Sequence, residues 1–310
     1  MGFIDTMRSE GHAVESTCAV LTEHGCPVAA RTYRAWKHRQ PVADRTVSDA
    51  IVVDKLRAVQ GTPESLYGRR KMTAYLRREG LQVAHCTVDR LMRQEGMNGV
   101  RRGRTVRTTI PGRDGRRAGD LLDRQFQAAA PNLVWVADFT YCRTWAGMVY
   151  VSFIVDVFAQ LIVGWHAATH KRTDLVLVPL QIALWDRDRA GHPVEAGKLL
   201  HHNDAGSQYT SIRFTEHLAL EGIAPSVGSV GDAYDNALME CVIGLFKTEC
   251  IHTQLFHDGP YRTIADVEYA TAGWTDWYNH RRLHSTLGMV PPAEFEHHHY
   301  AALKPQEQPV

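Results

Sequence analysis

The run Trp135-Val-Ala-Asp-Phe-Thr-Tyr141 carries an acid, Asp138, among apolar, β-branched and aromatic residues. Runs of this composition predict a buried β-strand. A carboxylate in a buried strand costs free energy unless it is paired with a cation or bound to a metal ion. This stretch therefore predicts a central strand of a sheet, and it marks Asp138 as a candidate functional residue.

Two further acids lie in equally distinctive surroundings. Asp204 lies within His201-His-Asn-Asp-Ala-Gly-Ser-Gln-Tyr-Thr-Ser211, and Glu240 lies within Gly231-Asp-Ala-Tyr-Asp-Asn-Ala-Leu-Met-Glu-Cys241. Asp204 follows a predicted strand at its carboxyl end, which is where open α/β sheets place their ligand sites. Glu240 falls on a predicted helix, so the two acids reach a common site from different elements.

The helix that carries Glu240 presents two more polar side chains on the same face. Asn236 and Lys247 stand at i−4 and i+7 from Glu240, and these spacings bring side chains to one side of a helix. Lysine can hold a phosphate as a point charge, and asparagine can orient a ligand. We therefore predict Asn236 and Lys247 as DNA-binding residues beside the acid.

Three separated carboxylates are the ligand set that hard divalent cations prefer, since Mg²⁺ takes oxygen ligands. A pair of such ions can activate an attacking oxygen and stabilise a leaving one during phosphoryl transfer. We therefore predict Asp138, Asp204 and Glu240 as catalytic residues and as ligands of two Mg²⁺ (or Mn²⁺) ions. The pattern indicates an enzyme that cuts and joins nucleic acid.

Structural roles compete with this interpretation. Any one of the three acids alone could cap a turn or pair with a basic neighbour, and only their combination favours catalysis. Asp232 and Asp235 are rival acids, but their context is typical of a turn and helix cap. Asp156, at the end of a predicted strand, is a possible accessory acid or a turn residue. His201 and His202 either touch a ligand or pack in their strand.

The order of predicted elements favours an α/β fold with a ribonuclease-H-like mixed sheet, preceded by an all-α helix-turn-helix region. Trp274 and Trp277, three residues apart on the last predicted helix, are expected in the core. The strands are predicted at 133–141, 148–156, 161–166, 198–203 and 224–227, and the helices at 173–189, 211–221, 234–248 and 264–280.

The N-terminal third is helical and basic. Helices predicted at 13–23 and 29–37 flank a short Gly-containing turn, the helix-turn-helix pattern. A second such pattern spans 48–97, with Thr87 as the cap of its last helix. The stretch 69–107 holds eleven Lys/Arg and three acids, a net charge of +8 in a chain of +1. A solvated helical face would also be basic, but the density favours DNA contacts by Arg69, Arg70, Arg77, Arg90, Arg93, Arg101, Arg102 and Arg104.

We predict five segments from these patterns: a helix-turn-helix at 1–47, a second at 48–98, a basic linker at 99–130, the catalytic core at 131–296 and a tail at 297–310. The His297–299 cluster is expected to be a polar helix end rather than a metal site.

No apolar run approaches the roughly 18 residues of a membrane span. The six cysteines form no Cys-x-x-Cys pair, which argues against a disulfide framework or zinc module. The cytoplasm is the expected location.

The three acidic motifs together resemble those of OrfB-type transposases of the insertion-sequence-three family, whose catalytic domain is similar to retroviral integrase. The resemblance covers about three quarters of the chain. It implies that Asp138, Asp204 and Glu240 form the catalytic triad and that Lys247 contacts DNA. It also rests on Tyr67-Gly68, on Tyr278-Asn-His-Arg-Arg-Leu-His284 and on Pro291-Pro-Ala-Glu-Phe295.

The resemblance further implies partners. The active enzyme would be a fusion with an upstream protein, OrfA, made by frameshifting, and it would act on DNA as a homo-oligomer at the bacterial nucleoid. Asn203 and Cys241 depart from the Ser or Thr that the family commonly has beside its acids. Two alternatives stay open: a DNA-binding regulator with vestigial acids, and a nuclease of the same fold that hydrolyses without joining.

Overall fold

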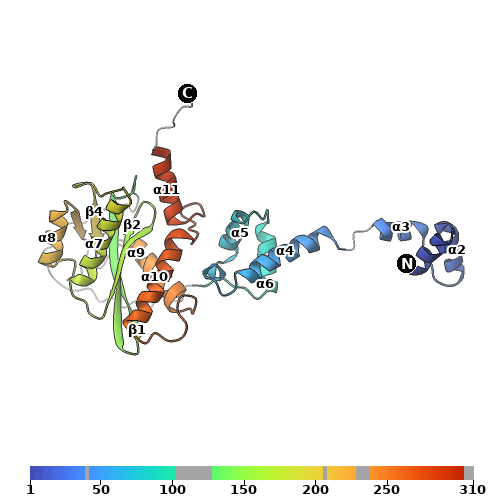
Figure 1. Ribbon diagram of the computed structural model, residues 1–310, viewed down its shortest axis with the longest axis horizontal. Coiled ribbons are helices and arrows are strands. Elements are labelled where there is room, and N and C mark those ends of the chain that lie inside the picture. The colour runs from blue at the N-terminus through green and yellow to red at the C-terminus, as the bar shows by residue number, and fades with distance from the viewer. Residues whose placement is uncertain (39–41, 102–127, 205–207, 228–236, 304–310) are drawn as a thin grey trace, which may run out of the picture. The chain divides into compact units, whose positions relative to one another are not determined.

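The predicted strands form one five-stranded mixed sheet in the computed structural model (Figure 1). The strand order is β3-β2-β1-β4-β5; β1 pairs antiparallel with β2 and parallel with β4. This is the ribonuclease-H-like arrangement expected from the sequence. The strands are β1 (Val134–Thr144), β2 (Gly147–Asp156), β3 (Leu161–Ala168), β4 (Leu200–Asn203) and β5 (Ala224–Val227).

The structure describes all residues except 39–41, 102–127, 205–207, 228–236 and 304–310. It divides into two compact units, Met1–Asp54 and Lys55–Val310. The predicted linker at 99–130 therefore falls mostly outside the described residues. No helix in the described part of the chain is both long and apolar enough to cross a membrane.

Helices cover both faces of the sheet, because strand side chains alternate between two buried sides. On one side Trp135 and Ala137 of β1 pack with α7 (Asp174–Arg189) and α8 (Ile212–Leu220). The opposite side is covered by α9 (Ala237–Leu245), a π-helical turn η2 (Phe246–Ile251) and α10 (Ile264–His280). There the rings of Phe153, Phe246 and Trp274 pack with centroids 5.0–5.9 Å apart.

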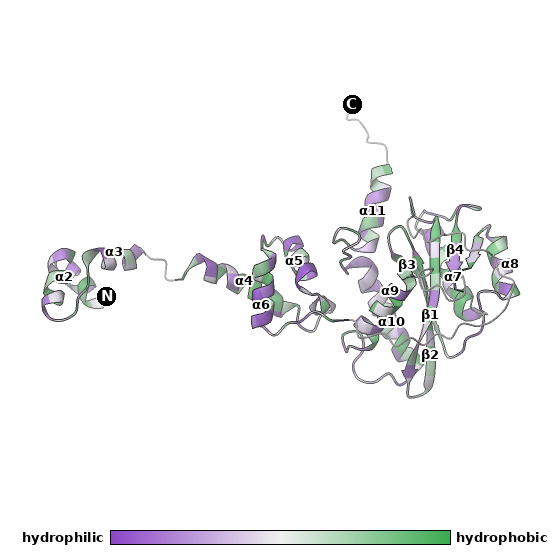
Figure 2. Ribbon diagram, turned by 180° about the vertical axis from the view of Figure 1, so that it is seen from behind, coloured by the Kyte–Doolittle hydropathy of each residue, from purple (hydrophilic) through white to green (hydrophobic). Residues whose placement is uncertain are grey.

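Trp274 and Trp277 are both fully buried, which confirms their predicted place in the core. Figure 2 shows hydrophobic green on parts of the strands, interrupted by hydrophilic purple.

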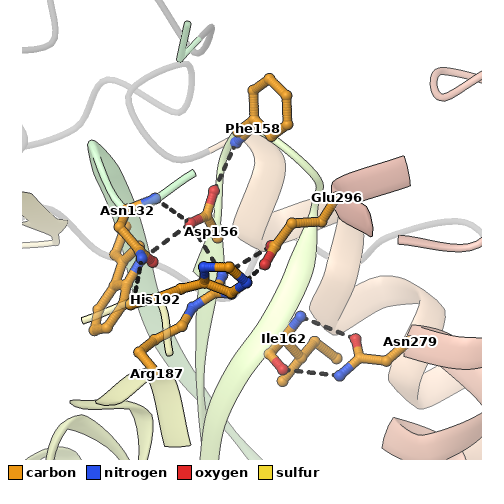
Figure 3. A network of polar contacts seen from close by, with 9 residues as sticks. Asn132, Asp156, Phe158, Ile162, Arg187, His192, Asn279 and Glu296 are labelled. Atoms are coloured by element: carbon orange, nitrogen blue, oxygen red, sulfur yellow. Dashed lines mark hydrogen bonds and ion pairs between the residues drawn. The ribbon is translucent and has the colours of Figure 1, made fainter. Parts of the chain in front are cut away.

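One side chain, Asn279, satisfies backbone hydrogen bonds on the edge strand β3. Strand β3 is an edge strand, so part of its backbone has no neighbouring strand. The Asn279 amide of α10 donates to the carbonyl oxygen of Ile162 at 2.8 Å and accepts from the Ile162 N–H at 3.0 Å (Figure 3). Asn279 thus replaces a strand partner, and it ties α10 to the sheet.

A buried ionic network joins β2, α7 and the C-terminal helix α11 (Pro292–Leu303) (Figure 3). Arg187 of α7 forms two hydrogen bonds to the Glu296 carboxylate and lies 3.3 Å from Asp156. Asp156 also accepts from the backbone N–H groups of Asn132 and Phe158, at 2.7 and 2.9 Å. Asp156 is therefore a structural residue; its contact with Phe158 confirms the predicted turn role, and the alternative of an accessory catalytic acid is wrong.

The predicted end of the core at 296 falls within helix α11. The helix runs through that boundary, and Glu296 on it is buried against Arg187. The sequence predicted a tail from 297 onward and a polar helix end at His297–299. Helix α11 is held by this ion pair, together with a ring contact between Phe158 and Phe295 at 5.3 Å.

The N-terminal unit contains α2 (Val14–Glu23), α3 (Ala30–His38) and an unpredicted helix, α1 (Gly2–Ser9). Helix α1 is held by Tyr33, which is buried and donates its hydroxyl hydrogen to Asp5 at 2.6 Å. Ile4 and Cys18 pack in the same small core.

Helix α4 (Asp44–Ala58) starts four residues before the predicted position, so the proposed boundary at 47/48 lies inside a helix.

The second basic segment contains η1 (Pro63–Leu66), α5 (Arg69–Arg78) and α6 (His85–Gln94). Helix α6 begins two residues before Thr87, with Ala84 as its N-cap and no side-chain cap, so the predicted cap is wrong. The helices pack through Met72, Leu76 and Val88, which are fully buried.

Tyr67 ties this segment to the sheet domain. Its hydroxyl accepts from the Leu283 N–H at 3.0 Å and donates to the carbonyl oxygen of Arg281 at 3.3 Å. The Tyr67 ring stacks on Trp277 at 6.0 Å. Two motifs far apart in the sequence, around Tyr67 and around Tyr278–His284, thus form one contact.

Candidate active site

Asp138 lies near the middle of β1, where it pairs in register with Phe153 of β2. Its side chain is partly buried, and one carboxylate oxygen accepts from the Phe139 N–H at 2.7 Å. Burial, and next the negative charge of Asp204, raises the pKa of Asp138 to about 7. Glu240 adds to the rise, while Lys247 opposes it.

The pairing of β1 with β4 brings Asp204 to Asp138. Asn203, the last residue of β4, lies opposite Ala137 of β1, and the two strands run parallel. The residues that follow this pair are Asp138 and Asp204, so the two acids lie at the same level along the sheet. Asp204 is exposed, as expected at the carboxyl end of a strand.

Glu240 reaches the same region from the first turn of α9 and is exposed to solvent. Met239 and Val242 are buried on the same helix and hold it against the sheet. The α-helix ends at Leu245 and continues as the π-helical turn η2, which contains Lys247. The regular helical phase predicted for Lys247 is therefore wrong, but its charge still acts on Asp138.

The effects of Asp204, Glu240 and Lys247 on the pKa of Asp138 show that these four predicted residues lie near one another. Three like charges in one place repel each other and favour a bound cation. Nevertheless, no group of three or more His, Cys, Asp or Glu side chains lies close enough to hold a metal ion among the residues that the structure describes. Asn236, Asp232 and Asp235 lie outside those residues.

Sequence reasoning missed two tyrosines at the site: Tyr209, which lies near the acids, and Tyr141, which lies against Lys247. Tyr209 is buried, and burial and then the charges of Asp138 and Asp204 raise its pKa well above the usual value. Tyr141 is half exposed, and the Lys247 ammonium lies 5.0 Å from its ring centre. Both tyrosines belong to the motifs that carry Asp204 and Asp138, which was the available signal.

His201 and His202 are fully buried on β4, so strand packing is their role. The His202 ring pairs with the Ser226 hydroxyl of β5 at 2.9 Å. Burial, with a smaller effect from His202, lowers the pKa of His201 to about 4.

The neutral state of His201 predicts acid sensitivity. An unfolded histidine takes a proton near pH 6.5, whereas folded His201 does so near pH 4. The unfolded state therefore binds more protons between these values, and stability falls as the pH falls through this window. We expect a loss of about 1–2 kcal/mol between pH 6.5 and 5, measured by urea unfolding. His201→Gln should make the free energy of unfolding less dependent on pH, whereas His297→Gln, at an exposed position, should not. Equal pH dependence of the two variants would contradict the assignment of this effect to His201.

The predicted DNA-binding arginines that the structure describes lie on or beside α5 and α6, and most are exposed. Some already have protein partners. Arg69 and Arg93 both pair with Asp89, and Arg77 donates two hydrogen bonds to the carbonyl oxygen of Val83 at 3.0 and 3.1 Å. Contacts of these arginines with DNA stay predictions; Arg102 and Arg104 lie outside the described residues.

Family models match most of the chain. Two models of the integrase core domain match residues 128–233 and 221–292, and a model of an HTH-like domain matches residues 52–105. Among solved structures, the simian T-cell lymphotropic virus intasome aligns with 79% of this chain and 73% of its own, at 16% identity and a TM-score of 0.47. The HTLV-2 integrase catalytic core domain aligns with 55% of this chain and 99% of its own, at 15% identity and a TM-score of 0.38.

Relatives among insertion-sequence proteins are much more similar. The chain is 46% identical to the protein of insertion sequence element IS986/IS6110 from Mycobacterium tuberculosis, over 89% of this chain and 97% of the relative. It is 42% identical to the transposase for IS629 from Shigella sonnei, over 98% and 97%. It is 31% identical to the transposase for IS904 from Lactococcus lactis, over 84% and 98%. The chain therefore belongs to the insertion-sequence-three family of transposases, the DDE class of polynucleotidyl transferases.

Proposed function

We propose that Asp138, Asp204 and Glu240 are the catalytic acids of this transposase and hold two Mg²⁺ or Mn²⁺ ions. The main support is that the charges of Asp204 and Glu240 both raise the pKa of Asp138. The donor set consists of carboxylate oxygens, which suit these ions. The cations would offset the repulsion between the acids. When bound, they would activate the attacking oxygen and stabilise the leaving one.

The reaction would run in two steps of the same chemistry. Water attacks a phosphodiester at the end of the element, and the bond to the 3′ oxygen breaks, which leaves a 3′-hydroxyl and a 5′-phosphate. The 3′-hydroxyl then attacks a phosphodiester of the target DNA and displaces another 3′ oxygen. Positioning and electrostatics supply most of the catalysis in such transfers.

Lys247 would hold a DNA phosphate next to the acids. Its ammonium lies over the Tyr141 ring, and its charge reaches Asp138. The ring would limit the freedom of the lysine side chain, so the positive charge is in place before the DNA arrives. Asn236 would orient the same DNA strand.

The basic helices α5 and α6 would bind the DNA duplex outside the reacting bond. The arginines predicted there are sequence-independent phosphate contacts, and α6 follows the turn of the helix-turn-helix pattern. We also propose that the protein works as a fusion with OrfA and as a homo-oligomer on DNA at the bacterial nucleoid.

Nicking of supercoiled plasmid tests the proposal. We expect strand cleavage in the presence of Mg²⁺ or Mn²⁺, and a loss of at least about a hundredfold for Glu240→Gln, which removes a charge with little change in volume. DNA binding should persist in a mobility-shift assay. Glu216→Gln, at an exposed position of α8, is the matched control and should cleave normally.

Full cleavage by Glu240→Gln would refute the assignment of the acids. Joined strands on a denaturing gel would separate the transposase from a nuclease that only hydrolyses. Binding without cleavage by the wild type fused to OrfA would favour the DNA-binding regulator instead.

A further inference from the structure

The hairpin formed by β1 and β2 extends beyond the acids and carries three aromatic rings, each with a cation over it. Lys247 lies 5.0 Å from the ring centre of Tyr141, and Lys171 lies 5.0 Å from that of Tyr150. At the hairpin tip the Arg262 guanidinium lies 5.3 Å from the Trp145 ring. We call these three ring–cation pairs the hairpin strip.

Lys247 links the hairpin strip to the acid site, because its ammonium lies over the Tyr141 ring and its charge acts on Asp138. Tyr141 lies three residues beyond Asp138 on β1, and Tyr150 is its directly paired neighbour on β2. Side chains of directly paired residues lie on the same face, so the two tyrosines lie on one face of the hairpin. At about 3.4 Å per residue the tip at Trp145 lies about 24 Å along the strand from Asp138, a length that several nucleotides can follow.

The hairpin strip is exposed, which a purely structural role does not require. Trp145 is 72% exposed and Tyr141 is 50% exposed. The tip is nevertheless held in place, since the N–H groups of Trp145 and Ala146 donate to the carbonyl oxygens of Tyr261 and Arg262 at 3.1 and 2.9 Å. A fixed, solvent-exposed tryptophan with a neighbouring cation is a surface prepared for a ligand.

The chemistry of this surface fits one ligand. Aromatic faces stack on unpaired bases, and cations spaced along them pair with phosphates, which is how proteins hold single-stranded nucleic acid. The only ionisable side chain between Phe139 and Val155 that is charged at neutral pH is Arg143, and it is exposed, so no acid of the hairpin opposes a polyanion.

We propose that the hairpin strip binds an unpaired segment of the DNA strand that enters the acid site, with bases on Trp145 and phosphates on Lys171, Lys247 and Arg262. The inference rests on the proposed function in one respect, namely that the reacting DNA strand lies at Asp138. The bound segment would then be the few nucleotides next to the reacting phosphodiester, which implies that the DNA end is opened before cleavage.

Helix α7 provides a matched control. Trp185 is 58% exposed, and the Arg189 guanidinium lies 5.1 Å from its ring centre. Trp185 lies eleven residues beyond Asp174, the first residue of α7, or about 16 Å along the helix from the end next to Lys171. The same ring–cation chemistry is therefore present away from the hairpin.

The test is fluorescence anisotropy with the full chain in EDTA, so that the DNA stays intact. The probes are a labelled blunt duplex of about twenty base pairs and the same duplex with a 3′ overhang of about five thymidines. We expect Trp145→Ala to weaken binding of the overhang probe about tenfold and binding of the blunt probe less than about twofold. Trp185→Ala should change neither.

Equal affinities of Trp145→Ala and wild type for the overhang probe would overturn the proposal, and so would equal losses for both probes. A second measurement covers the phosphate contacts. Lys171→Met should reduce the salt dependence of overhang binding by about 0.7 in the log–log slope, and an unchanged slope would remove Lys171 from the site. If the wild type nicks normally but Trp145→Ala binds the overhang probe as tightly as the wild type, the hairpin strip alone is refuted. If Trp145→Ala selectively loses overhang binding but the wild type does not nick, the proposed function alone is refuted.

Discussion

Asp138→Asn is expected to raise the melting temperature of the metal-free protein and at the same time to abolish strand cleavage. Asparagine has nearly the shape of aspartate and can still accept from the Phe139 N–H. It removes the charge that burial, Asp204 and Glu240 all disfavour. Function and stability therefore make opposite demands on this position.

The direction of this change in stability follows from the number of protons that the folded and unfolded states bind. The pKa of Asp138 is about 7 in the folded protein and near 3.8 in the unfolded chain. The folded state binds more protons between these values, so stability falls as the pH rises from about 4 through 7. Above pH 7 the whole penalty is present, about 1–3 kcal/mol because solvent contact of the carboxylate screens part of it. Removal of this penalty by Asp138→Asn should raise the melting temperature by about 3–8 °C.

Thermal unfolding in EDTA and plasmid nicking with Mg²⁺ measure the two effects. Mg²⁺ should stabilise the wild type, because binding to the folded state adds to its stability, and it should not stabilise Asp138→Asn. Asp186→Asn changes an exposed acid of α7 and should alter neither property. A lower melting temperature of Asp138→Asn in EDTA would show that the acids do not repel one another.

Arg187→Met is expected to destabilise the catalytic domain by about 3–5 kcal/mol, because it leaves buried carboxylates without their cation. Asp156 and Glu296 are 0% and 6% exposed, and Arg187 contacts both. Methionine fills much of the space but supplies no charge or hydrogen bond. The loss should appear as a large drop in the denaturation midpoint.

Chemical denaturation followed by tryptophan fluorescence measures this loss. Arg189→Met, two residues along the same helix, removes an exposed arginine and should cost less than about 1 kcal/mol. Glu296→Gln added to Arg187→Met should restore part of the stability, because one of the two uncompensated charges is removed. A normal midpoint for Arg187→Met would show that the network is not needed for folding.

The strands and the acids were predictable because their signals are local. Alternation of apolar residues and the position of each acid at a strand or helix indicated where Asp138, Asp204 and Glu240 would lie. The same reasoning placed Trp274 and Trp277 in the core, since their spacing brings them to one side of a helix. Such patterns depend only on the period of a strand or helix.

Other features depended on contacts between distant residues. Helix α1 and helix α11 have weak local signals and are held by Tyr33 and by Arg187, respectively. The Ala84 N-cap of α6, in place of the predicted Thr87, and the π-helical turn around Lys247 were also missed. The turn role of Asp156 was predicted, but nothing local indicated that Arg187 lies against it.

The sequence by itself determined the family and the sheet, and it predicted the three acids, because each signal lies in a short run of residues with a regular spacing. Only the tertiary structure decided which groups surround those acids. The parallel register of β1 and β4 placed Asp204 beside Asp138, and burial together with the charge of Asp204 raises the pKa of Asp138. Electrostatic energy depends on distance through space, and those distances exist only after the chain has folded.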